Sequence, residues 1–288
     1  MKKLFLSLAF VGTMISVNAQ ELPQPSPKST LQQRVGLTDI TIDYSRPSTK
    51  DRAVFTDVVT PGKLWRTGAN MNTTIEVSSP VVIEGQTLEA GTYSIFTIPN
   101  ADKWTVIFNK KTDHGGTSGY TEDNDVLRVE AKVAPIKQPV ETFTIDVNDI
   151  RTESASLVFT WQNTRVSVPF TVEVKSIASS NIEKALNEAE EADKWKVYRN
   201  AANYYHNNNM EGAKALEYIN KSIEGKSDSW YSYWLKAEIL AAKEDYKGAV
   251  KAAKESIKVG EEGAKESGAS FDYTAMIEDG INDWKSKK

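Results

Sequence analysis

The sequence predicts a mainly-β domain over residues 34–176, followed by an α-helical domain over residues 180–288. In the first part, short runs of valine, isoleucine, threonine and aromatic residues alternate with polar residues and are separated by turn-forming residues. Such alternation is typical of half-buried strands. No helix-length apolar period interrupts these runs, which favours an antiparallel β-sandwich or a barrel-like sheet over a parallel α/β sheet. In the second part, alanine, lysine and glutamate dominate, and apolar residues recur at helical spacing.

The predicted strands are read from apolar positions that recur every second residue. At the start of the domain this alternation slips by one residue between Leu37 and Ile40, which predicts a β-bulge after Leu37. A tight link at 162–164 is expected to separate the last two strands. The strands after Ile40 are expected at 75–77, 81–83, 93–98, 104–108, 126–133, 143–147, 157–161 and 166–174.

The N-terminus has the layout of a secretory signal peptide. A positively charged segment, residues 1–3, precedes an apolar run over residues 4–15, and Ala19 stands at a small-residue position before a cleavage site. The run is shorter than the roughly 20 residues of a membrane-spanning helix, although an uncleaved N-terminal anchor is the alternative. We therefore expect residues 1–19 to be removed and the protein to be periplasmic or extracellular. A proline-rich arm, residues 20–33, is expected to follow.

The composition argues against several kinds of site and partner. The sequence contains no cysteine, which excludes disulfides, thiolate metal sites and a cysteine nucleophile. The net charge of −4 becomes about −6 without Lys2 and Lys3. A protein of this charge has no general attraction for nucleic acid or anionic membranes. We expect no nucleic-acid partner, and no membrane span after signal cleavage.

The helical domain contains an internal repeat. Shifting the sequence by about 34 residues, the tetratricopeptide period, places Ala215 on Ala249 and Ser222 on Ser256. Residues 193–260 therefore resemble two tetratricopeptide repeats, a helical hairpin architecture that commonly binds a protein or peptide. Gly260 is expected to end a helix. Helices are predicted near 181–192, 193–207, 211–224, 229–243, 246–260 and 272–286, with the first and last as caps.

One ordered set of residues in the β domain is more specific than the rest of the sequence. This set resembles a family of exported bacterial proteins known as domain of unknown function 2911, over about residues 28–174. Its most distinctive element is Trp65-Arg66-Thr67-Gly68-Ala69-Asn70. The resemblance implies one β domain in an exported protein and implies no activity. The set also includes Tyr44-Ser45-Arg46-Pro47, Asp51-Arg52, Ala90-Gly91-Thr92-Tyr93-Ser94, Trp104-Thr105-Val106-Ile107-Phe108-Asn109 and Asp125-Val126-Leu127-Arg128.

Five residues of this set are candidate ligand-binding residues. Arg46, Arg52 and Arg66 carry guanidinium groups, which suit carboxylate or phosphate groups. With Trp65 as a stacking face and Asn70 as a hydrogen-bonding group, they are candidates to line a pocket for an anionic or sugar-like ligand on the β domain. The alternative is structural: Trp65 plugs the end of the sandwich, and the polar side chains bond to loop carbonyls.

No catalytic or metal-binding motif is evident. His114 and His206 are far apart in the sequence, and residues 122–125 lack the glycine and terminal glutamate of a calcium loop. We therefore expect no metal and no cofactor, and a non-enzymatic cell-envelope protein with a ligand-binding β domain and a protein-binding helical repeat. One alternative is a hydrolase of envelope polysaccharide, with catalytic carboxylates in or beside residues 65–70. The other is a helical region that serves only as a structural brace.

Overall fold

The computed structural model describes residues 22–113 and 115–287. The expected signal peptide, residues 1–19, lies outside the described residues. The chain divides into two compact units, with the division between Val174 and Lys175. The first unit is built from strands and the second from helices, which confirms the mainly-β plus α class predicted from the sequence.

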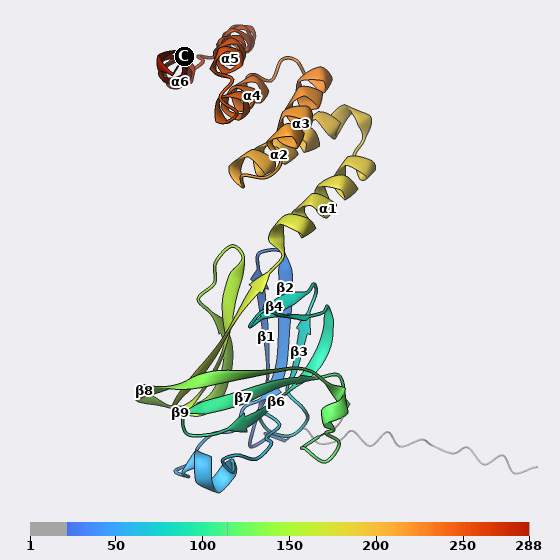
Figure 1. The fold of residues 1–288 in the computed structure, drawn as a ribbon, viewed down its shortest axis with the longest axis vertical. Helices are drawn as coiled ribbons and strands as arrows, with labels where there is room; N and C mark the ends of the chain where they lie inside the picture. Colours follow the sequence, from blue (N-terminus) through green and yellow to red (C-terminus); the bar gives the residue numbers. More distant parts are fainter. Residues whose placement is uncertain (1–21, 114, 288) are drawn as a thin grey trace, which may run out of the picture. The chain divides into compact units, whose positions relative to one another are not determined.

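Within the described residues, nine strands form one antiparallel sheet in the order β1-β2-β3-β6-β7-β8-β9-β4-β5. The long strands β8 and β9 curve strongly, and the sheet bends around one apolar core (Figure 1). The strands are β1 (Lys28–Val35), β2 (Thr38–Ser45), β3 (Thr74–Val77), β4 (Val81–Ile83), β5 (Gln86–Leu88), β6 (Gly91–Pro99), β7 (Lys103–Asn109), β8 (Asp125–Asn148) and β9 (Ser154–Val172).

A two-residue turn joins β1 to β2 where the sequence pattern predicted a bulge. The register pairs Val35 directly with Thr38, which leaves Gly36 and Leu37 in the turn. Gly36 has a φ of +57°, a left-handed conformation that glycine adopts readily. The prediction of a bulge was therefore wrong. The alternation slips because β1 ends there and β2 begins. β1 also begins at Lys28, inside the segment expected to be an extended arm.

β8 and β9 are two continuous strands where the sequence pattern predicted four shorter ones. The first third of β8, up to Lys132, pairs with β7, and the remainder, from Val133, pairs with β9. The β8–β9 ladder changes register between Pro135 and Thr144, a stretch that also contains Pro139. Proline has no N–H to donate to a ladder, which accounts for the irregular pairing there. β9 continues through residues 162–164, so the tight link predicted there was wrong.

An aromatic cluster fills part of the β core. Residues 46–73 connect β2 to β3 and carry Trp65 into this cluster, where its side chain is 9% exposed. The Trp65 ring stacks on Trp161, with 5.8 Å between ring centroids and 17° between the planes. It also meets Phe143 at 5.0 Å and Trp104 at 6.1 Å, both edge to face. Trp65 is therefore a core residue.

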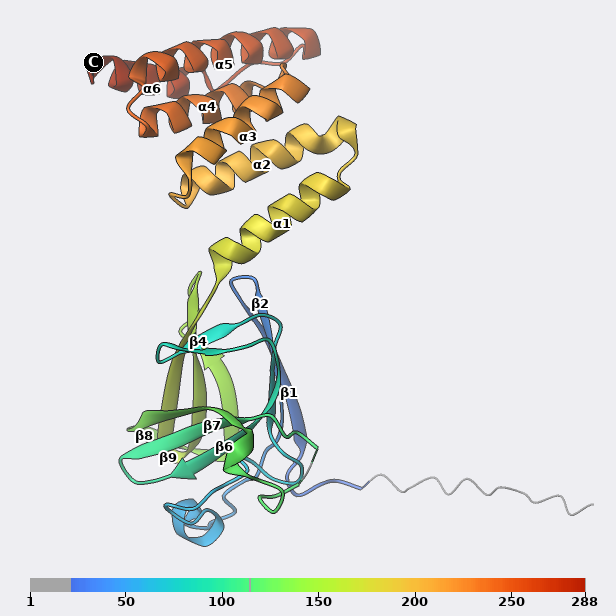
Figure 2. The same cartoon turned by 45° about the vertical axis from the view of Figure 1, so that its right-hand side comes forward.

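The helical unit consists of antiparallel helix pairs that follow one another in chain order (Figure 2). In the described part of the chain, no helix combines the length and the apolar character needed to cross a membrane. The helices are α1 (Val174–Glu188), α2 (Lys194–Asn207), α3 (Gly212–Gly225), α4 (Trp230–Ala242), α5 (Tyr246–Ser267) and α6 (Thr274–Ser286).

Two helix boundaries differ from the sequence expectation. α1 begins at Val174, well before the start predicted near residue 181. α5 continues to Ser267 and passes through Gly260, which was expected to end it. A Cβ atom on Gly260 would lie 2.3 Å from Cζ of Phe271. The glycine therefore allows the Phe271 ring to pack closely on the helix, and it does not break the helix.

Replacing Trp65 with alanine tests its place in the core. We expect Trp65→Ala to lower the free energy of unfolding by about 3–5 kcal/mol, because the cavity left in the aromatic cluster cannot be refilled. The measurement is equilibrium denaturation of the full chain. Met71→Ala is the control, since Met71 lies nearby in the sequence but is 60% exposed, and we expect a change within about 0.5 kcal/mol. Equal losses in the two variants would contradict this role.

Candidate functional site

Two of the three candidate arginines are bonded within the β unit. Arg46 donates from Nε to the carbonyl oxygen of Phe143 at 3.0 Å and from Nη2 to Oγ1 of Thr144 at 2.7 Å. Arg52 donates to two backbone carbonyls of its own loop, at 2.8 and 2.9 Å. These bonds tie the connection between β2 and β3 to itself and to β8. They favour a structural role for both residues, and their ligand-binding role stays a prediction.

Asn70 also holds two segments of the β unit together. Its Nδ2 donates to the carbonyl oxygen of Ser26 at 3.1 Å and to Oγ of Ser45 at 3.2 Å. Asn70 has a φ of +60°, a conformation that asparagine tolerates better than most residues. These contacts place the residue where the chain enters β1 and leaves β2.

Arg66 differs from the other four candidates. An isolated antiparallel bridge pairs Trp65 with Thr97 of β6. Successive side chains of an extended segment point to opposite faces, so Arg66 is turned away from the core that receives Trp65. The Nε atom of Arg66 is buried without a hydrogen-bond partner among the described residues. A Cβ atom on Gly116 would lie 3.4 Å from Nη1 of Arg66, so the loop between β7 and β8 lies against the guanidinium.

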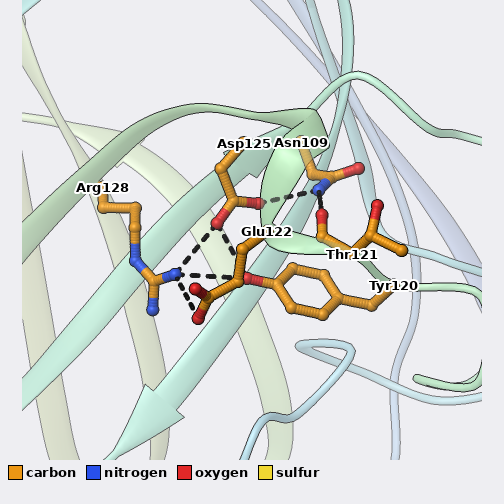
Figure 3. A network of polar contacts seen from close by, with 6 residues as sticks. All are labelled: Asn109, Tyr120, Thr121, Glu122, Asp125 and Arg128. Carbon is orange, nitrogen blue, oxygen red and sulfur yellow. Dashed lines mark hydrogen bonds and ion pairs between the residues drawn. The ribbon is translucent and has the colours of Figure 1, made fainter.

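A polar network anchors the loop between β7 and β8 (Figure 3). Its centre is Asp125 at the start of β8, whose side chain is 7% exposed. The carboxylate accepts hydrogen bonds from Nδ2 of Asn109 and Oη of Tyr120, both at 2.7 Å, and from Nη1 of Arg128 at 3.0 Å. Arg128 also pairs with Glu122 at 3.0 Å. The loop is therefore fastened to β7 at one end and to β8 at the other.

The network continues from Asn109 toward the segment that precedes β3. Oδ1 of Asn109 accepts from the backbone N–H of Lys111 at 3.0 Å, and the Lys111 carbonyl accepts from Oγ of Ser94 at 2.7 Å. Oγ of Ser94 in turn accepts from Nδ2 of Asn72 at 3.0 Å. Asn72 is 7% exposed, and its Oδ1 is buried without a partner in the described residues.

The geometry brings together two loops that are distant in the sequence. Met71 bridges to Gly115, beside the contact between Arg66 and Gly116. We call Arg66, Asn72 and the Gly115–Gly116 segment the Arg66 site. His114 lies outside the described residues. The site holds a guanidinium whose buried Nε has no acceptor, and a buried amide oxygen without a donor. Both atoms are buried and unsatisfied within the described residues.

The network beside the Arg66 site is poorly suited to proton transfer. Burial, together with the hydrogen bond to Asp125, raises the pKa of Tyr120 from 10.0 to about 12. The phenol therefore stays protonated near neutral pH and cannot act as a general base. The Asp125 carboxylate is occupied by three donors.

Sequence reasoning missed most of this network. The sequence pattern identified residues 122–125 only as an acidic stretch without the features of a calcium loop, whereas the side chain of Asp125 is 7% exposed and forms the centre of the network. The signal that was available is the pair Asp125 and Arg128, three residues apart in the family-like set. Among the described residues, no group of three or more histidine, cysteine, aspartate or glutamate side chains is placed to hold a metal ion.

Comparison with known proteins gives a family assignment for the β unit. Residues 26–170 match the family model described as "Protein of unknown function (DUF2911)". The match includes all five candidate residues and the polar network around Asp125. No curated protein and no solved structure gives a significant match to the chain. The helical unit lies outside the matched range.

Removing the Asp125 carboxylate tests the anchoring of the loop. We expect Asp125→Ala to lower the free energy of unfolding by about 2–3 kcal/mol, because Asn109, Tyr120 and Arg128 lose a shared acceptor. Asp123→Ala is the matched control on the same turn, since Asp123 is exposed, and its effect is expected to stay within about 0.5 kcal/mol. Thermal or chemical denaturation measures both. A neutral effect of Asp125→Ala would show that the network does not anchor the loop.

The raised pKa of Tyr120 predicts a stability change at alkaline pH. The folded-state pKa of about 12 lies above the ordinary value of 10.0, so folding favours the protonated phenol. This contribution is complete below pH 10 and is lost as pH rises toward 12. We expect Tyr120→Phe to show a smaller decrease in the free energy of unfolding over this range than the unmodified protein. If the free energy of unfolding fell equally with pH in the two proteins, the raised pKa of Tyr120 would be contradicted.

Proposed function

The chain belongs to the DUF2911 family of proteins of unknown function, and we propose that it is an exported, non-enzymatic binding protein. In this proposal the β unit holds an anionic ligand at the Arg66 site, and the helical unit binds a protein or peptide. The signal-peptide pattern of residues 1–19 supports export to the periplasm or the extracellular space.

The observation that carries the ligand proposal is the missing hydrogen-bond acceptor at Nε of Arg66. Arg66 is half-buried as a residue, but its Nε atom is buried without an acceptor among the described residues, which costs free energy because the N–H loses water and gains nothing in exchange. A carboxylate or phosphate group supplies the missing acceptor, and the planar guanidinium can bond to two of its oxygens at once. Oδ1 of Asn72 is a second buried atom without a partner among the described residues, and a hydroxyl or amide donor would supply what it lacks. An acidic sugar or a hydroxy acid combines both features.

The surroundings of Arg66 support binding over hydrolysis. A glycoside hydrolase of the usual kind needs two carboxyl groups, one as acid and one as base or nucleophile. The buried carboxylate of this region, Asp125, is occupied by three donors, and Glu122 is paired with Arg128. These groups are engaged in holding the loop.

Helix pairing supports the second half of the proposal. α2 with α3 and α4 with α5 form successive hairpins, the arrangement that tetratricopeptide repeats use. Two buried serines hydrogen-bond across the junction of these hairpins, Ser222 on α3 and Ser232 on α4. Repeats of this kind present extended surfaces that commonly bind proteins or peptides.

Anion titration of the Arg66→Ala variant tests the ligand proposal. We expect inorganic phosphate or citrate to raise the melting temperature of the unmodified protein, because a ligand that binds only the folded state stabilises it. Arg66→Ala should lose this anion-dependent increase. Arg165→Ala is the control, as Arg165 is another partly buried arginine of the β unit, and it should keep the increase. An equal anion response in all three proteins would exclude an anion site at Arg66.

A further inference from the structure

We propose that a groove on the helical unit, formed by α3, α4 and α5, binds an acidic peptide that carries leucine-like side chains. This inference rests on the proposed binding role of the helical unit and assigns it a place and a chemistry. The groove has a volume of about 550 Å³. Its apolar lining comes from one residue of each helix: Leu216 on α3, Leu240 on α4 and Ala252 on α5.

The carboxylates that line the groove are bonded to other groups of the protein, whereas, within the described residues, the lysines that line it are not. Asp245 caps α5, with Oδ1 accepting from the backbone N–H of Gly248 at 2.9 Å. Glu255 pairs with Lys258 at 3.4 Å. The two cations of the lining, Lys236 and Lys251, form no ion pair with any described residue. The lining therefore holds two carboxylates and two lysines, so its formal charges balance, and the lysines are the two of these four groups that have neither an ion pair nor a capping bond among the described residues.

A stripe of lysines on α5 adds positive charge beside the groove. Lys247, Lys251, Lys254 and Lys258 follow at helical spacing, so they lie along one side of the helix. Of these four, Lys258 alone is ion-paired within the described part of the chain. Lys247 stands in the first turn, where the helix dipole disfavours a cation. Lys247, Lys251 and Lys254 are exposed and carry no ion pair among the described residues.

Tyr233 joins the groove to the lysine stripe. Its side chain lines the groove, and its pKa is raised by burial and by the nearby Glu255, while Lys258 lowers it. The phenol is thus within electrostatic reach of both residues on α5. The lining therefore offers an occupant an aromatic ring, apolar side chains and two lysines.

This combination favours one kind of occupant. A nucleic acid or a polyphosphate would use the lysines and leave the apolar side chains of the lining without a partner. A neutral apolar peptide would use these apolar side chains and leave the cations unpaired. A peptide in which acidic residues alternate with leucine or similar residues uses both, since complementary charge speeds and orients its association while the apolar side chains fill the groove.

Fluorescence anisotropy with the full chain tests this inference. The ligand is a fluorescein-labelled peptide in which glutamate alternates with leucine, and its partner peptide has serine in place of leucine. We expect the leucine peptide to bind and the serine peptide to bind at least about tenfold more weakly. The double variant Lys236→Glu with Lys251→Glu should weaken binding of the leucine peptide by about tenfold, which corresponds to about 1.4 kcal/mol.

The control reverses the same number of charges elsewhere on the helical unit. Lys175→Glu with Lys265→Glu changes two exposed lysines that do not line the groove, and it should leave the affinity within about twofold. Three results would overturn the groove assignment: no binding of the leucine peptide, equal binding of the serine peptide, or equal weakening by both double variants. Equal binding of the serine peptide would indicate a site for polyanions.

The same samples separate this inference from the proposed function. Phosphate titration of the groove variant reports on the Arg66 site independently of the peptide. If the peptide fails to bind while the Arg66-dependent anion response persists, the groove assignment is overturned and the ligand role of the β unit stands. If the anion response fails while the peptide binds, the Arg66 site is excluded and the groove stands.

Discussion

The packing of Trp65 against Trp161, Phe143 and Trp104 is the interaction on which the candidate site depends. It fixes the connection between β2 and β3, and the bridge to Thr97 turns the next side chain to the opposite face. Three residues after Trp65, a Cβ atom on Gly68 would lie 2.9 Å from the carbonyl oxygen of Ser45. Only glycine allows the chain to pass this close. The most distinctive segment of the family-like set thus combines a core anchor, an outward arginine and a close backbone approach.

Asp125 anchors the loop between β7 and β8, as Trp65 anchors the connection between β2 and β3. Its buried carboxylate gathers donors from β7, from the loop and from β8, and the chain of bonds through Asn109 and Ser94 reaches Asn72. The polar network and the bridge between Met71 and Gly115 hold the two loops against each other, and the aromatic cluster fixes the first loop to the core on the opposite face. A guanidinium placed between two anchored loops loses little conformational freedom when it binds an anion, because its surroundings are already ordered.

Sequence patterns predicted the two-part architecture, since alternation and helical spacing are local properties of the chain. They failed at β8 and β9, because a bent strand with an irregular ladder resembles two short strands. They also failed at Gly260, which was expected to end a helix but instead leaves room for the Phe271 ring to pack on it. For the candidate site, residue types alone suggested that three arginines bind an anion. Which of them has an Nε atom without an acceptor in the described part of the chain depends on long-range bonds, such as that from Arg46 to Phe143 across the sheet. The burial of Asp125 likewise depends on the pairing of β7 with β8.

Nuclear magnetic resonance of the arginine Nε–H groups in the full chain tests the central claim most directly. The Arg66 signal is identified by its loss in Arg66→Lys. We expect this signal to shift on addition of inorganic phosphate, with saturation, while the signal of Arg46, whose Nε already donates to Phe143 at 3.0 Å, stays in place. That result would show that the outward arginine beside Trp65 receives an anion. An Arg66 signal that does not respond to phosphate, or that moves no more than the Arg46 signal, would contradict the account.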